Sequence, residues 1–229
     1  MTLAPQQAVD EPQSLPIGES RWPPIVAVAL FMTVNIIVRI WLPGNGVAHM
    51  PWLMPAVEAA FLVVLLTSNP GNVRERQRLR RVSLLLVGLL VLAALWGTAV
   101  LIADLIRGVG VSKSPSKLLA SGAEVWLGNI IAFAMLYWLI DGGGPIARNH
   151  LRTPVDFAFT QHMSPEIAPT GWKPVFLDYL HLGFTNATAF SPTDVMPLTH
   201  RVKYAMVVQS TVALALFGLV VARAVNAFT

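Results

Sequence analysis

Five long apolar stretches constrain this chain more than any other feature of its sequence. They lie at 24–42, 50–67, 82–106, 118–140 and 204–228. A helix needs about 20 apolar residues to cross roughly 30 Å of hydrocarbon, and none of the five alternates polar and apolar residues as a membrane barrel strand does. The sequence therefore predicts an all-α integral membrane protein with about five transmembrane helices and the lipid bilayer as its partner.

The composition excludes several other classes of protein. Hydrophobic residues make up 55% of the chain and charged residues only 12%, whereas a soluble domain averages about 25% charged residues. Disorder, nucleic-acid binding and an ordinary cytosolic enzyme are therefore excluded. The chain has no cysteine, which excludes disulfides, thiolate metal sites and thiol nucleophiles. We expect no cofactor and no metal.

The order of the apolar stretches divides the chain into three parts. Residues 1–22 are polar and proline-rich, without the basic start of a signal peptide, and we expect a flexible tail. Residues 23–110 hold three predicted membrane helices, with an arginine-rich loop at 72–81. Residues 111–229 hold an outer helix, a loop, a short pore-like helix and the last helix. We expect a multi-pass protein of the cell (inner) membrane.

The composition changes between the fourth and fifth apolar stretches. Residues 141–145 read Asp-Gly-Gly-Gly-Pro, a helix stop. Further on, residues 175–190 are moderately apolar and about four helical turns long, but they include Asp178, His181 and Asn186. This segment is short and polar for a full crossing. Its pattern is typical of a re-entrant helix, which enters a membrane and turns back while surrounded by protein.

From Phe176 the line FLDYLHLGFTNATAFSPTDVMPLT resembles the pore loop of the tetrameric, potassium-channel-like cation channels. It is also similar to uncharacterised bacterial membrane-protein families that share this degenerate line. In the superfamily a short helix leads into a filter written TTVGYGD, followed by a proline and the inner helix. The residues that overlie the filter are Thr188, Ala189, Phe190, Ser191, Pro192, Thr193 and Asp194. The resemblance covers about a quarter of the chain, from residue 173 to the end.

The resemblance implies a homotetramer whose fourth and fifth apolar stretches serve as outer and inner helices. Ser191 and Thr193 replace the two filter glycines, and Pro192 replaces the aromatic residue between them. Because glycine permits the backbone angles that turn filter carbonyls toward an ion, we expect no potassium selectivity. The filter-like segment keeps the hydroxyls of Thr188, Ser191 and Thr193. Around a four-fold axis, Asp194 would add a ring of carboxylates, and together these groups predict a weakly selective channel for monovalent cations.

The same letters have a second interpretation. Ser191 is a good helix N-cap, Pro192 suits the first helical position, and Asp194 favours a helix N-terminus. On that interpretation residues 191–194 only begin a connection into the last helix, and the fold does not conduct.

Ionisable residues inside the predicted helices each cost about 2.5–3.5 kcal/mol on insertion scales. Those singled out are Arg39, Glu58, Glu124, Asp178 and His181. A functional interpretation makes Glu58 or Glu124 a station for protons or cations, and a structural one pairs Arg39 with Glu58. Asp178 and His181 share one helix face and form either a titrating pair or a packing contact.

Uncharged polar residues within the apolar stretches suggest further contacts. Asn35 and Asn129 are expected to form hydrogen bonds between helices. Gln209, Ser210 and Thr211 are candidates for lining a central cavity from the last helix.

The orientation stays open at this point. A cytoplasmic N-terminus puts the arginines of residues 69–81 inside, as the positive-inside rule requires, but then residues 175–190 enter from the cytoplasm. The orientation of potassium channels puts those arginines outside. A complete crossing by residues 175–190 gives six spans and leaves Asp178 and His181 in the bilayer.

Other functions also stay open. An ion- or proton-coupled secondary transporter is one alternative, because broken helices build transporter sites, although no internal repeat is visible. A non-conducting membrane scaffold is another. The chain contains no GxSxG, HExxH or GxxxxGK[ST] motif, and we expect it not to be an enzyme.

Overall fold

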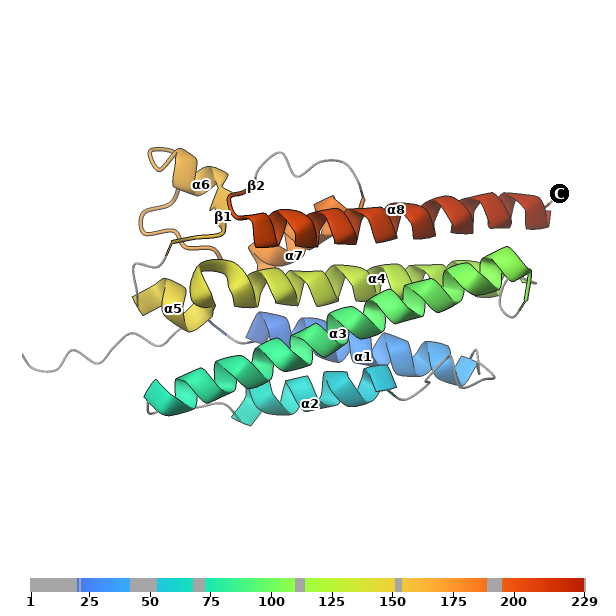
Figure 1. Ribbon diagram of the computed structural model, residues 1–229, viewed down its shortest axis with the longest axis horizontal. Coiled ribbons are helices and arrows are strands. Elements are labelled where there is room, and N and C mark those ends of the chain that lie inside the picture. Colours follow the sequence, from blue (N-terminus) through green and yellow to red (C-terminus); the bar gives the residue numbers. More distant parts are fainter. Residues whose placement is uncertain are drawn as a thin grey trace, which may run out of the picture.

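The computed structural model describes residues 20, 22–41, 53–67, 73–109, 114–150, 154–188 and 195–228. Most of them are helical, as expected, and the long helices lie side by side in a bundle (Figure 1). These helices are α1 (Trp22–Trp41), α2 (Leu53–Thr67), α3 (Val73–Arg107), α4 (Pro115–Ile140) and α8 (His200–Phe228). They fall on the five apolar stretches of the sequence.

Three of these helices are long and apolar enough to cross a membrane, which supports a membrane protein. They are the helices of Gln77–Arg107, Ser116–Gly143 and His200–Arg223. The apolar parts of α1 and α2, Trp22–Val38 and Pro55–Thr67, are shorter. With 15 residues, α2 is only about 22 Å long at 1.5 Å per residue.

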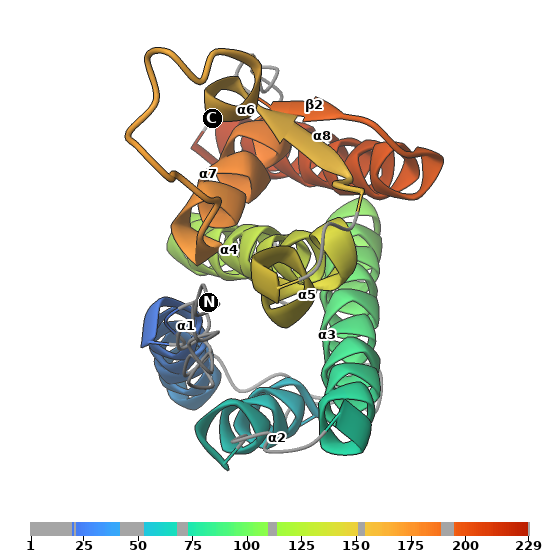
Figure 2. The ribbon, with the colours of Figure 1, turned by 90° about the vertical axis from the view of Figure 1, so that its left-hand side faces the viewer.

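Helix α4 forms the centre of the bundle. It packs against α1, α3, α7 (Phe176–Ala187) and α8. Viewed along the bundle, α1 and α2 lie on one side of α4, α7 and α8 lie on the other, and α3 runs along the edge (Figure 2). Of the most apolar window of α4, 56% is buried in the protein, against 28% for α3 and for α8. The core therefore lies around α4.

Two glycines allow other helices to approach α4 closely. A Cβ added to Gly128 of α4 would lie 2.8 Å from the ring of Phe31 on α1. A Cβ added to Gly183 of α7 would lie 3.0 Å from the carbonyl oxygen of Ile130 on α4. Small residues at contacts of this kind are typical of helix packing in membranes, where close van der Waals contact drives association.

Short elements gather at one end of the bundle, between α4 and α8 (Figure 1). They are η3 (Asp141–Gly143), α5 (Pro145–His150), β1 (Phe157–Phe159), α6 (Thr160–Met163) and β2 (Val195–Pro197). Strands β1 and β2 pair antiparallel, with Ala158 opposite Met196. We expected only a loop and the pore-like helix here, because strands of three residues are too short to show an alternating pattern.

One expectation about the start of a helix is wrong. Helix α3 begins at Val73, so most of the arginine-rich segment 72–81 is helical and not a loop. Arginine, glutamine and leucine are good helix formers, and they extend the apolar helix backward. The last helix, α8, begins at His200, after β2, and residues 191–194 lie outside the described residues.

Candidate functional site

Helix α7 is a half-length helix that lies between α4 and α8. Its 12 residues span about 18 Å. At its first residue the ring of Phe176 lies 6.0 Å from that of Trp138, and near its end the ring of Phe184 lies 5.7 Å from that of Trp126. Since Trp138 and Trp126 lie three turns apart on α4, α7 runs antiparallel to the second half of α4.

The two strands that flank α7 in the chain pair with each other. Strand β1 precedes α7 and β2 follows it, and Phe159 lies opposite Val195. A helix that crossed the whole bundle would separate these strands. Strand β2 therefore lies, after α7, at the end of the bundle from which α7 started (Figure 1), and α7 itself covers only part of the length of α4.

A buried carboxylate ties the first turn of α7 to the end of α4. Asp141, which is fully buried, accepts a hydrogen bond from the Tyr179 hydroxyl of α7. It also accepts hydrogen bonds from the backbone N–H groups of Asp156, at 2.7 Å, and Phe157, at 3.2 Å. One side chain thus joins α4, α7 and the segment that leads into β1.

Arg148 of α5 covers the same place from outside. Its guanidinium carbon lies 4.9 Å from the centre of the Tyr179 ring, a cation–π contact. It also donates hydrogen bonds to the carbonyl oxygens of Trp138, at 2.9 Å, and Asp141, at 2.8 Å. These carbonyls belong to the last turn of α4, where a positive charge is favourable.

A second buried carboxylate ties the start of α8 to the same region. Asp156 accepts hydrogen bonds from Arg201, through Nε at 2.8 Å and through Nη2, and from Thr199 at 2.6 Å and the Gly142 N–H at 3.2 Å. Burial raises the pKa of the Asp156 carboxyl, but the hydrogen bonds from Arg201 and Thr199 outweigh burial and hold that pKa below its usual value. We call this set the end cluster; it consists of Asp141, Arg148, Asp156, Tyr179, Thr199 and Arg201.

A second polar group joins α4, α7 and α8 deep in the bundle. The Gln209 Oε1 atom accepts hydrogen bonds from the Tyr137 hydroxyl and from Asn186 Nδ2, each at 2.7 Å. Gln209 Nε2 donates to the Gly183 carbonyl at 2.9 Å, and Asn186 Nδ2 also donates to the Met206 carbonyl at 3.0 Å. We call Tyr137, Asn186 and Gln209 the tip network, because Asn186 lies in the last turn of α7.

Of the seven residues predicted to resemble a filter, only the first is among the described residues. Thr188 is half-buried directly after α7, and its hydroxyl lies 2.9 Å from the carbonyl oxygen of Thr185 and 3.2 Å from that of Phe184. The other six lie outside the described residues; they are Ala189, Phe190, Ser191, Pro192, Thr193 and Asp194.

The predictions for uncharged polar residues have mixed outcomes. Asn35 bonds between helices as expected, donating to Glu58 Oε1 at 3.1 Å. Asn129 is buried, but among the described residues neither of its amide atoms has a hydrogen-bond partner. Gln209 is buried inside one chain, so its assignment to a central cavity is wrong. Thr211 is exposed on α8.

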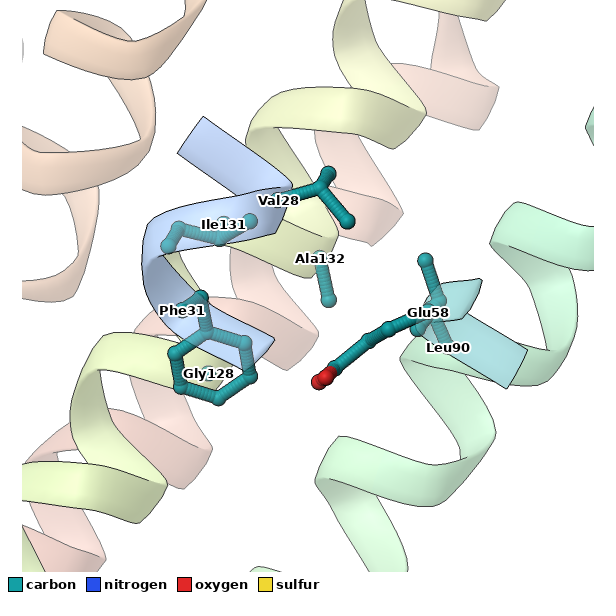
Figure 3. A pocket seen from close by; sticks show the side chains of 7 residues that line it. All are labelled: Val28, Phe31, Glu58, Leu90, Gly128, Ile131 and Ala132. Atoms are coloured by element: carbon teal, nitrogen blue, oxygen red, sulfur yellow. The ribbon is translucent and has the colours of Figure 1, made fainter. Parts of the chain in front are cut away.

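Glu58 is the buried carboxylate on the other side of α4. It is 1% exposed and points into a small cavity between α1, α2, α3 and α4 (Figure 3). The cavity measures about 10 Å³, roughly the room that the centre of one water molecule needs. Its lining is otherwise apolar: Val28, Phe31, Leu90, Gly128, Ile131 and Ala132.

The other ionisable candidates lie on three helices, α1, α4 and α7. Asp178 accepts a hydrogen bond from the Val175 N–H at 2.7 Å and so caps the start of α7. His181 is exposed on α7, and Glu124 is half-buried on α4. The side chain of Arg39 lies outside the described residues, and so does the predicted Arg39–Glu58 pair.

The end cluster as a unit is not predicted from the sequence. Asp141 was assigned only to a helix stop, although a carboxylate directly after a long apolar helix is itself a signal. Asp156 lies in the otherwise apolar run Val155–Phe159, a similar signal. No sequence pattern indicates their partners Tyr179 and Arg201, which are 38 and 45 residues away.

Within the described ranges, no three His, Asp or Glu side chains lie close enough together to hold a metal ion. No protein-family model, curated protein or solved structure matches the chain. The packing of α4, α7 and α8 is therefore the basis for a functional proposal.

Proposed function

We propose that this protein is one subunit of a homotetrameric membrane pore that conducts small monovalent cations with little selectivity. In this pore α4 is the outer helix, α7 the pore helix and α8 the inner helix. The observation that carries the proposal is the half-length α7, held between α4 and α8 while its two flanking strands pair with each other. The five long helices cross the cell (inner) membrane, and α7 is re-entrant.

The lengths of the segments are consistent with a re-entrant path. Helix α7 reaches about 18 Å into the bundle, which is about 60% of a hydrocarbon layer of roughly 30 Å. The six residues 189–194 connect its end to β2, and six residues extend at most about 20 Å. This length is enough to lead back along the 12 residues of α7, and it leaves almost no residues for a separate element.

The packing of α7 also satisfies the main physical requirement for such a path. Polar backbone at membrane depth is tolerated only where protein or water surrounds it. Here α4 and α8 cover one face of α7, and the tip network bonds its last turns to Gln209 of α8, which also accepts a hydrogen bond from Tyr137 of α4.

The pore is placed between subunits because a re-entrant loop forms a pore around a closed rotational axis. The outward faces of α7 and α8 carry exposed apolar side chains that neighbouring subunits and lipid would cover. These include Leu177, Phe184, Tyr204, Val207, Leu214 and Phe217. The cavity beside Glu58 lies on the far side of α4 and holds about one water molecule.

Cation preference follows from the end of α7 and from the return segment. The C-terminal end of a helix carries a partial negative charge, and α7 points that end into the bundle. Asp194 lies in the return segment and adds a carboxylate per subunit. Without the two filter glycines, K⁺ and Na⁺ pass at similar rates.

The first experiment measures the native mass of the full chain in nanodiscs and then the cation flux in liposomes. We expect a tetramer, similar K⁺ and Na⁺ fluxes, and a several-fold loss of flux in Asp194→Asn. Glu166→Gln, an exposed carboxylate ahead of α7, is the matched control and keeps the flux. A monomer, or a tetramer without flux under any gradient, contradicts the proposal, and the second outcome indicates a scaffold.

A proton-coupled transporter is the second candidate, and the buried Glu58 carboxylate beside a cavity favours it. In that case uptake depends on a proton gradient and is lost in Glu58→Gln. Glu166→Gln, which alters an exposed carboxylate ahead of α7, is the control. Flux that persists in Glu58→Gln without a gradient rejects the transporter.

A further inference from the structure

Helix α3 extends well beyond the apolar layer at one end. Its 35 residues are about 52 Å long, whereas a bilayer with its headgroups measures about 40–45 Å. The apolar part begins at Val82, and the residues before it are strongly polar. The surplus length therefore puts the first turns of α3, with exposed Arg78, Arg80 and Arg81, at the level of the headgroups.

Other basic residues lie at the same end of the bundle. This end also holds the end of α4, the start of α7 and the start of α8 (Figure 1). Lys173, Arg201 and Lys203 are exposed here, and Arg148 is half-buried. We call this surface the basic end; it consists of Arg78, Arg80, Arg81, Lys173, Arg201 and Lys203.

Among the described side chains of this end, acidic residues offset only part of the charge. Asp156 pairs with Arg201, Asp141 is buried in the end cluster, and Asp178 caps α7. Among the described residues of this end, Glu166 is an exposed carboxylate. At the opposite end the described basic positions are fewer: Arg39, Arg107, Lys117 and Arg223. The basic end is thus complementary to an anionic surface.

We propose that the basic end contacts the anionic phospholipid headgroups of the cytoplasmic leaflet, and that α7 therefore starts from the cytoplasmic side of the membrane. Basic residues close to the ends of membrane helices set orientation, with the richer side inside. Anionic lipids give the cytoplasmic surface a negative potential that attracts each such residue. The inference needs membrane-crossing helices but does not need the protein to conduct.

Thiol labelling tests the side directly, because the chain has no cysteine. Glu166→Cys introduces a thiol at the basic end, and Ser116→Cys introduces one at the exposed start of α4, at the opposite end. In intact bacterial cells a membrane-impermeant maleimide labels Ser116→Cys, and it labels Glu166→Cys only after the cells are permeabilised. Labelling of Glu166→Cys in intact cells overturns the proposal, whether or not Ser116→Cys is labelled.

Lipid dependence tests the contact. We compare the melting temperature of the purified full chain in phosphatidylglycerol and in phosphatidylcholine nanodiscs. We expect a higher melting temperature in phosphatidylglycerol than in phosphatidylcholine. In the double variant Arg78→Gln/Arg81→Gln, this difference in melting temperature should fall by about half or more. The matched control Arg107→Gln/Lys117→Gln changes two exposed basic residues of the opposite end and keeps the difference. Equal melting temperatures in the two lipids, or equal losses in the two variants, contradict the contact. A flux that survives either failure leaves the pore standing.

Discussion

The two sides of α4 are held together in different ways. On the side of α1, α2 and α3 the described core is mostly apolar, with the hydrogen bond from Asn35 to Glu58 inside it. On the side of α7 and α8 two polar groups, the end cluster and the tip network, join three helices each. The side of α4 with more hydrogen bonds between helices is the side that holds the short helix, since α7 is much shorter than α3.

Length matters because apolar contact gives little directional preference in a membrane. Lipid tails are as apolar as leucine, so helices associate through close packing and hydrogen bonds. A long helix has many turns over which packing can add up, whereas α7 has only six buried residues, one of them a glycine. Hydrogen bonds at both of its ends fix where it lies, and substitutions there should be more damaging than those on the other side of α4.

The largest expected effect is in Asp156→Ala. Removing the carboxylate leaves Thr199 and Arg201 without their buried acceptor, and we expect a loss of about 3 kcal/mol of unfolding free energy. The matched control Asp178→Ala removes only the cap of α7 and costs about 1 kcal/mol. Denaturant unfolding in detergent measures both. Equal losses of unfolding free energy in the two variants would show that the end cluster stabilises the fold no more than a helix cap does.

Gln209→Leu should have the next largest effect. It leaves the Tyr137 hydroxyl and the Asn186 amide without their shared acceptor, at a cost of about 2–3 kcal/mol. Ser210→Ala is the neighbouring control, because its hydroxyl bonds only to carbonyls of its own helix, and we expect less than about 0.5 kcal/mol. A Gln209→Leu variant as stable as the control would show that the tip network does not stabilise the fold.

The pH dependence of stability tests the end cluster without a large change in packing. The pKa of Asp156 is lowered in the folded protein, so its contribution is complete above the unfolded pKa of about 3.9. That contribution declines as the pH falls below this value and through the folded pKa. In Asp156→Asn this part of the acid-induced loss should be missing. Melting curves between pH 6 and pH 2, at about 0.15 M salt, distinguish a parallel loss in both proteins from the expected divergence.

The smallest expected effect distinguishes two asparagines. Asn129 has no hydrogen-bond partner among the described residues, so Asn129→Ala should cost less than about 0.5 kcal/mol. Asn186 bonds to Gln209 and Met206, and Asn186→Ala should cost about 2 kcal/mol. Thermal unfolding in the same detergent compares them. A larger loss in Asn129→Ala would reverse the comparison.

Apolar length was enough to predict the positions of the long helices and of α7. It was not enough to predict where α3 begins, because residues 73–81 are polar but favour helix. The pairing of β1 with β2 was out of reach, since each strand has three residues. A pattern in the sequence describes single elements, and this pairing depends on which distant elements meet.

The sequence was enough to predict the short helix of the candidate site but not the partners of its polar side chains. Polar residues such as Asp178 and Asn186 in a short, moderately apolar segment indicated a helix that needs protein around it, and α7 is packed between α4 and α8. Nothing local distinguishes Asn129 from Asn186, although one lacks partners among the described residues and the other joins the tip network. Likewise, the partner of Asp156 is an arginine 45 residues away, and many arginines were available.

The central claim is that the chain enters the membrane with α7 and returns to the same side. The most direct test labels two positions that flank α7 in the cysteine-free chain: Glu166→Cys before it and Leu198→Cys, also exposed, after it. With a membrane-impermeant maleimide, both thiols should react from the same side of the membrane. Reaction from opposite sides would show that α7 crosses, and would contradict the account.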